Sequence, residues 1–377
     1  MRNVVVALGL LAACKKGGDD KAAPKPVAAP DGGATASSAG AIPATTATGP
    51  VELPAAPPVP PSPMGLPALP TDHAPTANEV ALGALLFHDP RLAANGTTSC
   101  ASCHDPHNGY SSVEAHPRTS AGKPNLRRAP ALVNLAWQRE LGWDGRATDR
   151  PGFLDAHVVG QLGHPLEVGL GRILGSATYR AHFDRAAGGR DRLATATSAL
   201  WTFVATRYSG AAPWDRYEAG DTAAVPPEVV EGYKVYNGVA QCSTCHAPPL
   251  YTDLAFHRLG LAGPPDEGRG RSDPAQAGAF KTPTLRGAAG RRPLFHDGSA
   301  ATLDDAVTWH LGGGRASGTD AAADAGATAI PALTAVTLTP DERAALVAFL
   351  NALTPAPDAA AVAPPALPGD VPPGAAP

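Results

Sequence analysis

The sequence of 377 residues has few charged residues, no long apolar run and no basic cluster with aromatic residues, and each of these absences excludes a class of protein or partner. Charged residues make up 17%, below the usual quarter of a globular chain, and the net charge is −4. No apolar run approaches the length of about 18 residues that a membrane span needs, which excludes a multi-span membrane protein. No basic cluster carries interleaved aromatic residues, so we expect no nucleic-acid partner.

Proline and glycine are abundant instead, with 41 residues of each, but they follow no Gly-X-Y period, which excludes collagen. Of the prolines, 14 lie in residues 1–75 and 8 in residues 355–377, which leaves an ordinary content between them. This distribution predicts a Pro/Ala-rich tether over residues 14–75 and a disordered tail over residues 355–377, on either side of a globular core.

The first residues resemble a bacterial lipoprotein signal. An apolar run over residues 4–13 is too short to span a bilayer but suits the apolar region of a signal peptide. It ends in Leu11-Ala12-Ala13-Cys14, which resembles a lipobox whose cysteine is lipidated. We therefore expect a signal peptide over residues 1–13 and a periplasmic protein that contacts the membrane only through a lipid anchor. The alternative is an incidental apolar start with a free thiol.

The other four of the five cysteines form two Cys-x-x-Cys-His motifs, the attachment pattern of c-type haem. Two thiols on one helical turn can add to both haem vinyl groups, and the adjacent histidine then ligates the iron from the proximal side. The sequence therefore predicts two covalently bound c-type haems. Their attachment residues would be Cys100 and Cys103 with the iron ligand His104, and Cys242 and Cys245 with the iron ligand His246.

Other uses of paired cysteines fit less well. A thioredoxin-like site would need one pair in a βαβ context, and none is visible. A zinc ribbon would need its two pairs closer than the 142 residues that separate Cys100 from Cys242. Disulfides within each pair would leave both adjacent histidines unexplained.

Helical signals dominate the core, and alternating β patterns are rare. Helices are predicted over residues 80–87, 193–208, 303–311 and 343–353, with capping patterns at Thr76-Ala77-Asn78-Glu79 and Thr339-Pro340-Asp341-Glu342. The predicted fold class is mainly α, with two cytochrome c-type haem domains and long loops. The N-terminal haem domain would cover residues 76–225 and the C-terminal one residues 226–354, and the Gly/Ala/Asp-rich residues 312–329 would form a surface loop.

Six short motifs occur in a fixed order within residues 79–353. They are Leu86-Phe87-His88-Asp89-Pro90-Arg91-Leu92, Arg127-Arg128-Ala129-Pro130-Ala131-Leu132-Val133-Asn134, Trp143-Asp144-Gly145-Arg146, His164-Pro165-Leu166-Glu167-Val168-Gly169, Phe280-Lys281-Thr282-Pro283-Thr284-Leu285-Arg286 and Phe295-His296-Asp297-Gly298-Ser299. Together with the two cysteine motifs, they resemble the bacterial di-haem cytochrome c peroxidase family, which includes the MauG enzymes.

The resemblance implies that the two haems have different roles. The N-terminal haem would react with peroxide, and the C-terminal haem would receive electrons. Trp143 would lie between the haems as an electron bridge, and Glu167 would be the distal carboxylate that moves protons. Taken alone, Trp143 is equally a buried core aromatic, and Glu167 is more simply a surface carboxylate.

The chain departs from the family pattern around the first haem. Where better-known peroxidases often carry a histidine that caps the iron, this chain has Ser120, so we expect an open or water-bound sixth position. His116 is the alternative cap. His157 stands where a glutamine often accompanies the distal glutamate. It could act as an acid or base, or it could ligate the iron directly and close the site.

Two further departures concern the second haem and calcium. The family pattern places the distal ligand of the second haem at His310, and both methionines lie outside the core, which excludes a methionine ligand. Ligation by His246 and His310 would give a lower potential than His/Met ligation, although His310 also fits an ordinary core histidine. Arg128 replaces an asparagine with which family members bind calcium. A cation beside a guanidinium is unfavourable, so calcium is doubtful.

Three functions are compatible with these features. The first is a di-haem peroxidase that reduces hydrogen peroxide with electrons from a small redox protein, a cytochrome c or a cupredoxin, passed from the C-terminal haem through Trp143 to the N-terminal haem. The second is a MauG-like oxidation of side chains in a partner protein. The third is a non-catalytic electron-transfer cytochrome, favoured if His116 or His157 binds the first iron. The family resemblance also makes a homodimer possible.

Overall fold

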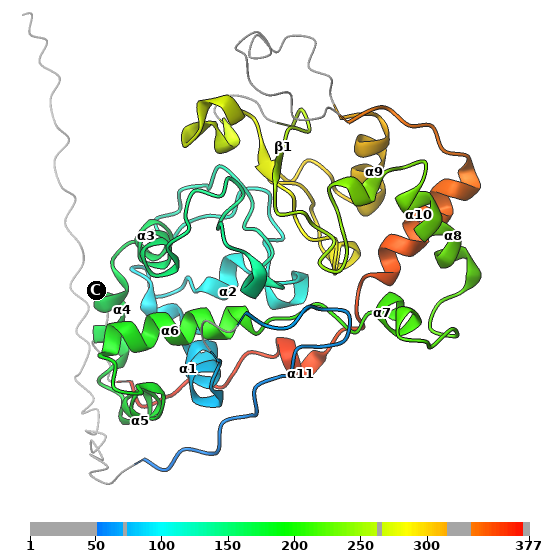
Figure 1. Ribbon diagram of the computed structural model, residues 1–377. Helices are drawn as coiled ribbons and strands as arrows, with labels where there is room; N and C mark the ends of the chain where they lie inside the picture. The colour runs from blue at the N-terminus through cyan, green and yellow to red at the C-terminus, as the bar shows by residue number, and fades with distance from the viewer. Residues whose placement is uncertain (1–50, 71–73, 262–265, 315–332, 372–377) are drawn as a thin grey trace, which may run out of the picture. The chain divides into compact units, whose positions relative to one another are not determined.

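The computed structural model describes residues 51–70, 74–261, 266–314 and 333–371. The described residues form one compact unit (Figure 1). The expected signal peptide, Cys14 and residues 15–50 of the expected tether lie outside the described residues. So do most of the loop expected over residues 312–329 and the last part of the expected tail, residues 372–377.

The described secondary structure is mainly helical, as predicted. The α-helices are α1 (Ala77–His88), α2 (Cys100–Cys103), α3 (Arg150–Leu162), α4 (Leu166–Ile173), α5 (Ala177–Ala186), α6 (Arg192–Ala205), α7 (Pro213–Glu218), α8 (Pro227–Asn237), α9 (Leu303–Leu311), α10 (Pro340–Ala352) and α11 (Ala359–Val362). Short 3-10 turns are η1 (Pro90–Leu92), η2 (Pro106–Asn108), η3 (Leu135–Trp137), η4 (Cys242–Thr244), η5 (Gly268–Arg271), η6 (Pro274–Gln276) and η7 (Ala288–Gly290). Within the described ranges, no helix has both the length and the apolar composition to cross a bilayer.

Two short strands, β1 (Phe256–His257) and β2 (Phe280–Lys281), form an antiparallel pair. Phe256 pairs with Lys281, and His257 pairs with Phe280. The pair brings Lys281 beside the loop that carries Trp143, because the Lys281 backbone N–H donates to the Trp143 carbonyl at 2.8 Å.

The helix starts predicted from capping patterns are confirmed. α1 begins at a capping box of Thr76 and Glu79, in which each side chain bonds the other residue's backbone N–H. α9 begins in the same way at Thr302 and Asp305, and α10 begins at Thr339. These bonds satisfy N–H groups that the first turn of a helix leaves free.

The helix predicted over residues 193–208 is shorter at its C-terminal end, since α6 stops at Ala205. The Thr206 hydroxyl donates to the carbonyls of Thr202 and Phe203, and the Arg207 guanidinium also bonds the Phe203 carbonyl. The Thr206 N–H still bonds the Thr202 carbonyl, but the Arg207 N–H bonds the Val204 carbonyl and leaves the Phe203 carbonyl to these side chains, so the regular helix ends there.

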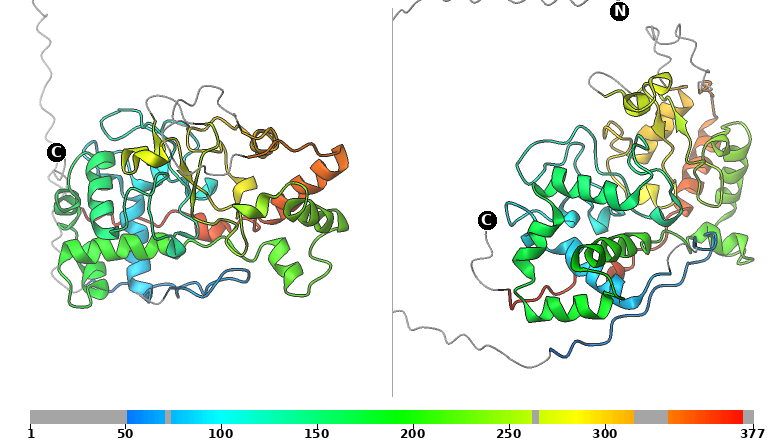
Figure 2. Two further views of the ribbon diagram at one scale, coloured as in Figure 1. Left: turned by 45° about the horizontal axis from the view of Figure 1, so that its top comes forward. Right: turned by 60° about the vertical axis from the view of Figure 1, so that its left-hand side comes forward.

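Two hydrophobic cores lie within the unit, and each is built on a pair of helices that cross at a glycine. In the first, α1 packs against α6, and a Cβ atom at Gly83 would lie 2.0 Å from the Ala199 carbonyl oxygen. In the second, α8 packs against α10, and a Cβ atom at Gly232 would lie 1.9 Å from the Ala345 carbonyl oxygen. Only glycine allows these close approaches. Figure 2 shows both helix pairs from other directions.

We call residues 76–212 the first half and residues 213–354 the second half. The boundary predicted at residue 225 would place α7 in the first half, but Trp214 of α7 packs in the second core. Asp215 of α7 also forms a buried, bidentate ion pair with Arg286, with nitrogen–oxygen distances of 2.8 and 2.9 Å.

Parts of the segments predicted as a tether and a tail contact the first half. Residues 51–70 accept bonds from Arg185 at the carbonyls of Leu53 and Pro54. In the segment after α10, the Asp370 carboxylate accepts bonds from the Ser176 hydroxyl and the Thr178 backbone N–H. Leu367 and Val371 also pack against the first core. Within residues 355–371, Leu367, Asp370 and Val371 therefore contact the first half.

Candidate functional site

The first cysteine motif lies on α2, a single helical turn, and His104 follows directly. Its Nδ1 atom bonds the carbonyl oxygens of Tyr110 at 3.0 Å and Pro130 at 3.1 Å. Because both partners are acceptors, Nδ1 carries the proton, and Nε2 is left with a lone pair for a metal. Burial lowers the pKa of His104, which keeps the ring neutral as a ligand must be.

His157 of α3 faces His104, with the ring centres 6.2 Å apart. Two imidazoles bound on opposite sides of one metal, with metal–nitrogen bonds of about 2 Å, would have ring centres about 6 Å apart. The pair therefore fits an iron held between two histidines. Burial, with the nearby His104 and Arg146, lowers the pKa of His157 to about 3, so its ring is also neutral. Phe153 stacks on the ring of His157 at 5.6 Å and fixes its orientation.

The second cysteine motif has the same arrangement. Cys242 begins η4, and the Nδ1 atom of His246 donates to the Tyr251 carbonyl at 3.2 Å. His310 of α9 faces His246 with ring centres 6.2 Å apart, and its own Nδ1 donates to the Ala306 carbonyl. Burial, and then His310, lower the pKa of His246 to about 4. Both motifs thus present a proximal histidine with a second imidazole opposite.

A cavity of about 760 Å³ lies beside the first motif. Its lining includes His116, Lys123, Leu126 and Gly160, and the Arg118 carbonyl lies 3.9 Å from the Cys103 sulfur. This volume lies within the range of about 300–1,000 Å³ that is usual for ligand and cofactor sites. The fit of a covalently attached haem at the first motif rests on the position of Cys100 and Cys103 on one helical turn and on the facing rings of His104 and His157.

His116 was predicted as the alternative cap of the first iron, and Ser120 stands where other peroxidases carry the capping histidine. Nδ1 of His116 bonds the Asn125 carbonyl, and the side chain is exposed at the rim of the cavity. The Ser120 backbone N–H donates to the Gln161 carbonyl, at the end of α3. His157 is the residue that faces His104.

Trp143 lies where the two halves meet. Its indole N–H donates to the Arg128 carbonyl at 2.9 Å, and its ring centre is 6.3 Å from that of His296. The Arg128 backbone N–H in turn donates to the His296 carbonyl at 2.9 Å. Since the Pro130 carbonyl bonds His104, the three residues 128–130 connect the first proximal histidine, the tryptophan and the second half.

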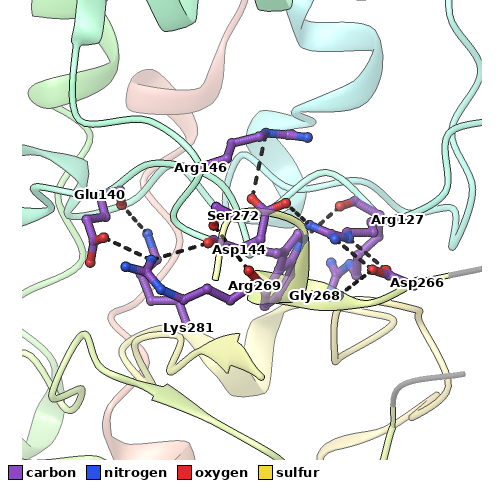
Figure 3. Close-up of polar contacts among 11 residues, drawn as sticks. Arg127, Glu140, Asp144, Arg146, Asp266, Gly268, Arg269, Ser272 and Lys281 are labelled. Carbon is purple, nitrogen blue, oxygen red and sulfur yellow. Dashed lines mark hydrogen bonds and ion pairs between the residues drawn. The ribbon is translucent and has the colours of Figure 1, made fainter. Parts of the chain in front are cut away.

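A network of charges holds this junction (Figure 3). Arg127 bonds Asp266 of the second half through two nitrogens, at 2.7 and 2.6 Å, and pairs with Asp144 of the first half at 2.8 Å. Burial alone would raise the pKa of Asp266, but the bonds from Arg127 and Gly268 outweigh it and hold the pKa below its ordinary value. Arg127 therefore carries a positive charge shared by one carboxylate from each half.

Two further bridges lie on the other side of Asp144 (Figure 3). Arg269 of the second half pairs with Glu140 of the first half at 2.9 Å. The Lys281 ammonium donates to the Gln138 side chain and the Glu140 carbonyl, both at 2.6 Å. Burial lowers the pKa of Lys281 to about 8, against the opposing effect of Glu140 and Asp144. Together these contacts fix the loop that carries Trp143 against β2.

Arg128, predicted to disfavour calcium, is buried, and Glu167, predicted as the distal carboxylate, is exposed. The Arg128 guanidinium is buried and donates to the Ser111 hydroxyl and the Ser112 carbonyl, and burial lowers its pKa to about 10. It remains a cation at neutral pH, which disfavours calcium at this position. Glu167 lies exposed in the first turn of α4, and no contact among the described residues holds it beside His104 or His157.

Among the described residues, one group of side chains has the spacing of a separate metal site, namely Cys245, Asp253 and His257. Cys245 is a haem-attachment cysteine, so its sulfur would be a thioether when haem is bound. The group therefore belongs to the second haem site.

Comparison with known proteins identifies the family. A family model described as di-haem cytochrome c peroxidase matches residues 77–223. The cytochrome-c peroxidase IdrP1 of Denitromonas iodatirespirans is 32% identical over 353 residues, which cover 82% of this chain and 89% of that protein. This chain belongs to the di-haem cytochrome c peroxidase family. It is an oxidoreductase of that family and carries two c-type haems.

Both MauG proteins and di-haem peroxidases resemble this chain. The methylamine utilization protein MauG of Methylorubrum extorquens is 34% identical over 247 residues, which cover 63% of this chain and 70% of that protein. A crystal structure of a MauG-like protein associated with microbial copper homeostasis has a TM-score of 0.68 at 28% identity, and the match covers 83% of this chain and 97% of that one. The di-haem peroxidase BthA of Burkholderia thailandensis, with a TM-score of 0.59 at 21% identity, shares the fold.

Sequence reasoning did not find the charges that position Trp143. Arg127 lies in one of the recognised motifs, but its partner Asp266 is 139 residues away and lies in no motif. Glu140, the partner of Arg269, likewise lies in no motif, so no local pattern in the sequence marks either ion pair.

Proposed function

We propose that this protein is a periplasmic di-haem peroxidase that reduces hydrogen peroxide to two molecules of water with two electrons and two protons. A small redox protein, a cytochrome c or a cupredoxin, would supply the electrons to the second haem. Each haem, held by its two cysteines and proximal histidine, supplies an iron that can change its charge by single electrons. The observation that supports the proposal is the contact of Trp143 with His296 on one side and with the Arg128 carbonyl on the other, together with the bond of the Pro130 carbonyl to His104.

The chain's own residues would conduct electrons across the junction. Phe295 lies 5.7 Å from His310 and precedes His296 in the chain. From His296 the route continues through its carbonyl to the Arg128 N–H, and from Arg128 to the indole of Trp143. Electron tunnelling becomes slower steeply with distance, so a route made of covalent and hydrogen-bonded steps is faster than one across empty space.

His157 and Glu167 would manage access and protons at the first site. His157 stands opposite His104 at the spacing of two ligands of one metal, so peroxide would bind after His157 has moved away. A displaced neutral imidazole can take the proton that peroxide loses on the side of the iron and return it to the leaving oxygen. Glu167 is exposed and would exchange protons between this site and the solvent.

Two other functions have support of their own. Identity with MauG at 34% supports the oxidation of side chains in a partner protein, with Trp143 again as the conductor. The spacing of His157 and His104 supports a non-catalytic electron-transfer cytochrome, because an iron with two firmly held histidines has no place for peroxide. The N-terminal sequence pattern further supports a lipid-anchored periplasmic protein, and the family a homodimer.

Spectra and turnover distinguish these functions. We expect hydrogen peroxide to oxidise the diferrous protein and to be consumed steadily with reduced cytochrome c or a reduced cupredoxin as donor. Reaction with peroxide but failure of every soluble donor would favour the oxidation of a partner protein. Two low-spin ferric haems together with no reaction with peroxide would overturn the proposal in favour of the electron-transfer cytochrome.

A further inference from the structure

The two cores differ in how easily their aromatic residues are oxidised. The aromatic residues around the first core include three phenylalanines, Phe87, Phe183 and Phe203, beside two tyrosines, Tyr110 and Tyr179. The second core has a single phenylalanine, Phe349, among Trp214, Tyr217, Tyr233, Tyr236 and Tyr251. Tryptophan and tyrosine can lose one electron at potentials that an oxidised haem can reach, whereas phenylalanine cannot. Of the two cores, the second is therefore the one in which residues that can carry an electron predominate.

These residues begin at the second haem-attachment motif. The Tyr236 hydroxyl donates to the carbonyl of His246, and Cys242 packs against the same cluster. The Tyr251 carbonyl accepts the bond from His246 Nδ1. Tyr236 thus connects the proximal side of the second site with the rest of the cluster.

From Tyr236 the rings lead outward in short steps. The ring of Tyr233 lies 6.4 Å from that of Tyr236 and 4.6 Å from that of Trp214. Tyr217 stacks on Trp214 at 5.0 Å. Tyr236 and Trp214 are buried, while Tyr233 of α8 and Tyr217 of α7 are partly exposed. The series therefore leads from the second haem-attachment motif to partly exposed tyrosines on α7 and α8, the helices labelled in Figure 1.

We propose that Tyr236, Tyr233, Trp214 and Tyr217 form a relay for single electrons between the second haem and the surface of α7 and α8. The relay rests on the proposed function, because it needs an oxidised second haem as the acceptor. It gives that function an entry point for electrons. A one-electron donor that docks at α7 and α8 would serve the enzyme without touching the haem itself.

Electrons and protons balance along the relay. Trp214 gives one electron to the oxidised second haem, by way of Tyr233 and Tyr236, and becomes a radical cation that keeps its proton. Tyr217 then gives one electron to Trp214 and releases its phenolic proton to water. The external donor returns one electron to Tyr217, which takes a proton back from water. One electron has then moved from the donor to the haem, and every side chain is restored.

The relay can be tested without peroxide by driving it in the opposite direction. In the full-length holoprotein, a tris(bipyridine)ruthenium label would be attached at Arg216→Cys, an exposed position on α7 next to Tyr217. Cys14→Ser leaves the label position as the single free thiol. With both haems reduced, a flash and a quencher oxidise the ruthenium, and absorption reports how fast a haem is oxidised. We expect this rate to fall at least tenfold in Trp214→Phe and several-fold in Tyr233→Phe.

A matched control separates conduction from packing. Phe349 contacts Trp214, Tyr233 and Tyr236 at ring distances of 5.1, 5.2 and 4.9 Å, but it cannot be oxidised. Phe349→Leu disturbs the same cluster, and we expect it to leave the rate within twofold of the labelled parent. Equal rates in the parent and Trp214→Phe would overturn the relay, and so would an equal loss in Trp214→Phe and Phe349→Leu.

A peroxide experiment then separates failure of the relay from failure of the proposed function. Without a donor, peroxide should leave a tryptophan or tyrosine radical that electron paramagnetic resonance detects and that Trp214→Phe loses. If peroxide oxidises the haems but the radical is the same in Trp214→Phe, the relay is wrong and the peroxidase stands. If peroxide does not react, the proposed function is wrong, and the ruthenium experiment alone decides whether the relay conducts.

Discussion

His157 faces His104 with ring centres 6.2 Å apart, the same distance that separates His310 from His246. In each pair, the histidine of the cysteine motif is oriented by backbone carbonyls, and the opposite one comes from a helix, α3 or α9. Equal spacing at two sites built from different segments indicates one common requirement, which is a metal between two imidazoles. The two sites nevertheless differ in the aromatic residue beside the opposite histidine. Phe153 stacks on His157, whereas Phe295 lies at a tilt, 5.7 Å from His310.

Replacement of His157 should free the binding position opposite His104 at the first haem and leave the second haem unchanged. In His157→Gln the ferric protein should change from two low-spin haems to one low-spin and one high-spin haem, because glutamine does not replace imidazole as a ligand. Electron paramagnetic resonance and the ferric absorption spectrum measure the change. His116→Gln is the matched control and should keep both haems low-spin. A spectrum of His157→Gln identical to that of the parent would show that His157 is not a ligand.

Replacement of His310 by methionine should raise the potential of the second haem alone. Methionine ligation raises a haem potential above that of bis-histidine ligation, within the span of about 0.8 V that axial ligands control. Spectroelectrochemical titration of the parent and His310→Met measures both potentials. An unchanged pair of potentials would contradict the assignment of His310 as a ligand and return it to the role of a core histidine.

Trp143→Phe should slow electron transfer between the haems while both stay attached. We expect kcat for peroxide to fall at least about tenfold, which corresponds to about 1.4 kcal/mol of barrier. Phenylalanine preserves an aromatic ring but loses the N–H bond to Arg128 and is not oxidised. Trp137→Phe, which loses a similar bond to the Ala68 carbonyl in the first half, is the control and should keep kcat within twofold. Equal kcat values in the two variants would contradict the bridge.

Acid should weaken the junction through Asp266. Because its pKa is lower in the folded protein, Asp266 stabilises the fold at pH values above its unfolded pKa, near 3.9, and this contribution disappears as the pH falls through the folded pKa. The difference in free energy of unfolding between the parent and Asp266→Asn should be constant above about pH 5 and shrink toward pH 3. Urea unfolding at several pH values measures it, and a constant difference down to pH 3 would contradict the assignment.

The sequence predicts the haem motifs, the fold class and three helix starts well, because each depends on residues a few positions apart. Two thiols and a histidine must lie on one turn to hold a haem, and a capping box needs two residues three positions apart. The opposite histidines were harder to predict. His310 was reached through a family pattern, whereas for His157 an acid, a base and a ligand remained open until its ring was found opposite His104.

The junction and the outer segments were missed for a different reason. The pair of Arg127 and Asp266 joins residues 139 positions apart, and no local pattern marks a long-range ion pair. Composition likewise predicted a disordered tail after residue 354, since prolines and alanines there cannot form a core of their own. Leu367 and Val371 instead join a core that already exists, and Asp370 takes bonds from Ser176 and Thr178.

Because of this C-terminal segment, the first core is complete only when the end of the chain has been synthesised. Leu367 and Val371 complete the first core, yet they are synthesised after the entire second half. While the chain is still emerging, the first core lacks these side chains, although α1 and α6, which form its centre, are already complete. A chain truncated before residue 367 would therefore leave part of the first core exposed to water, and its first half would be less stable than that of the full chain.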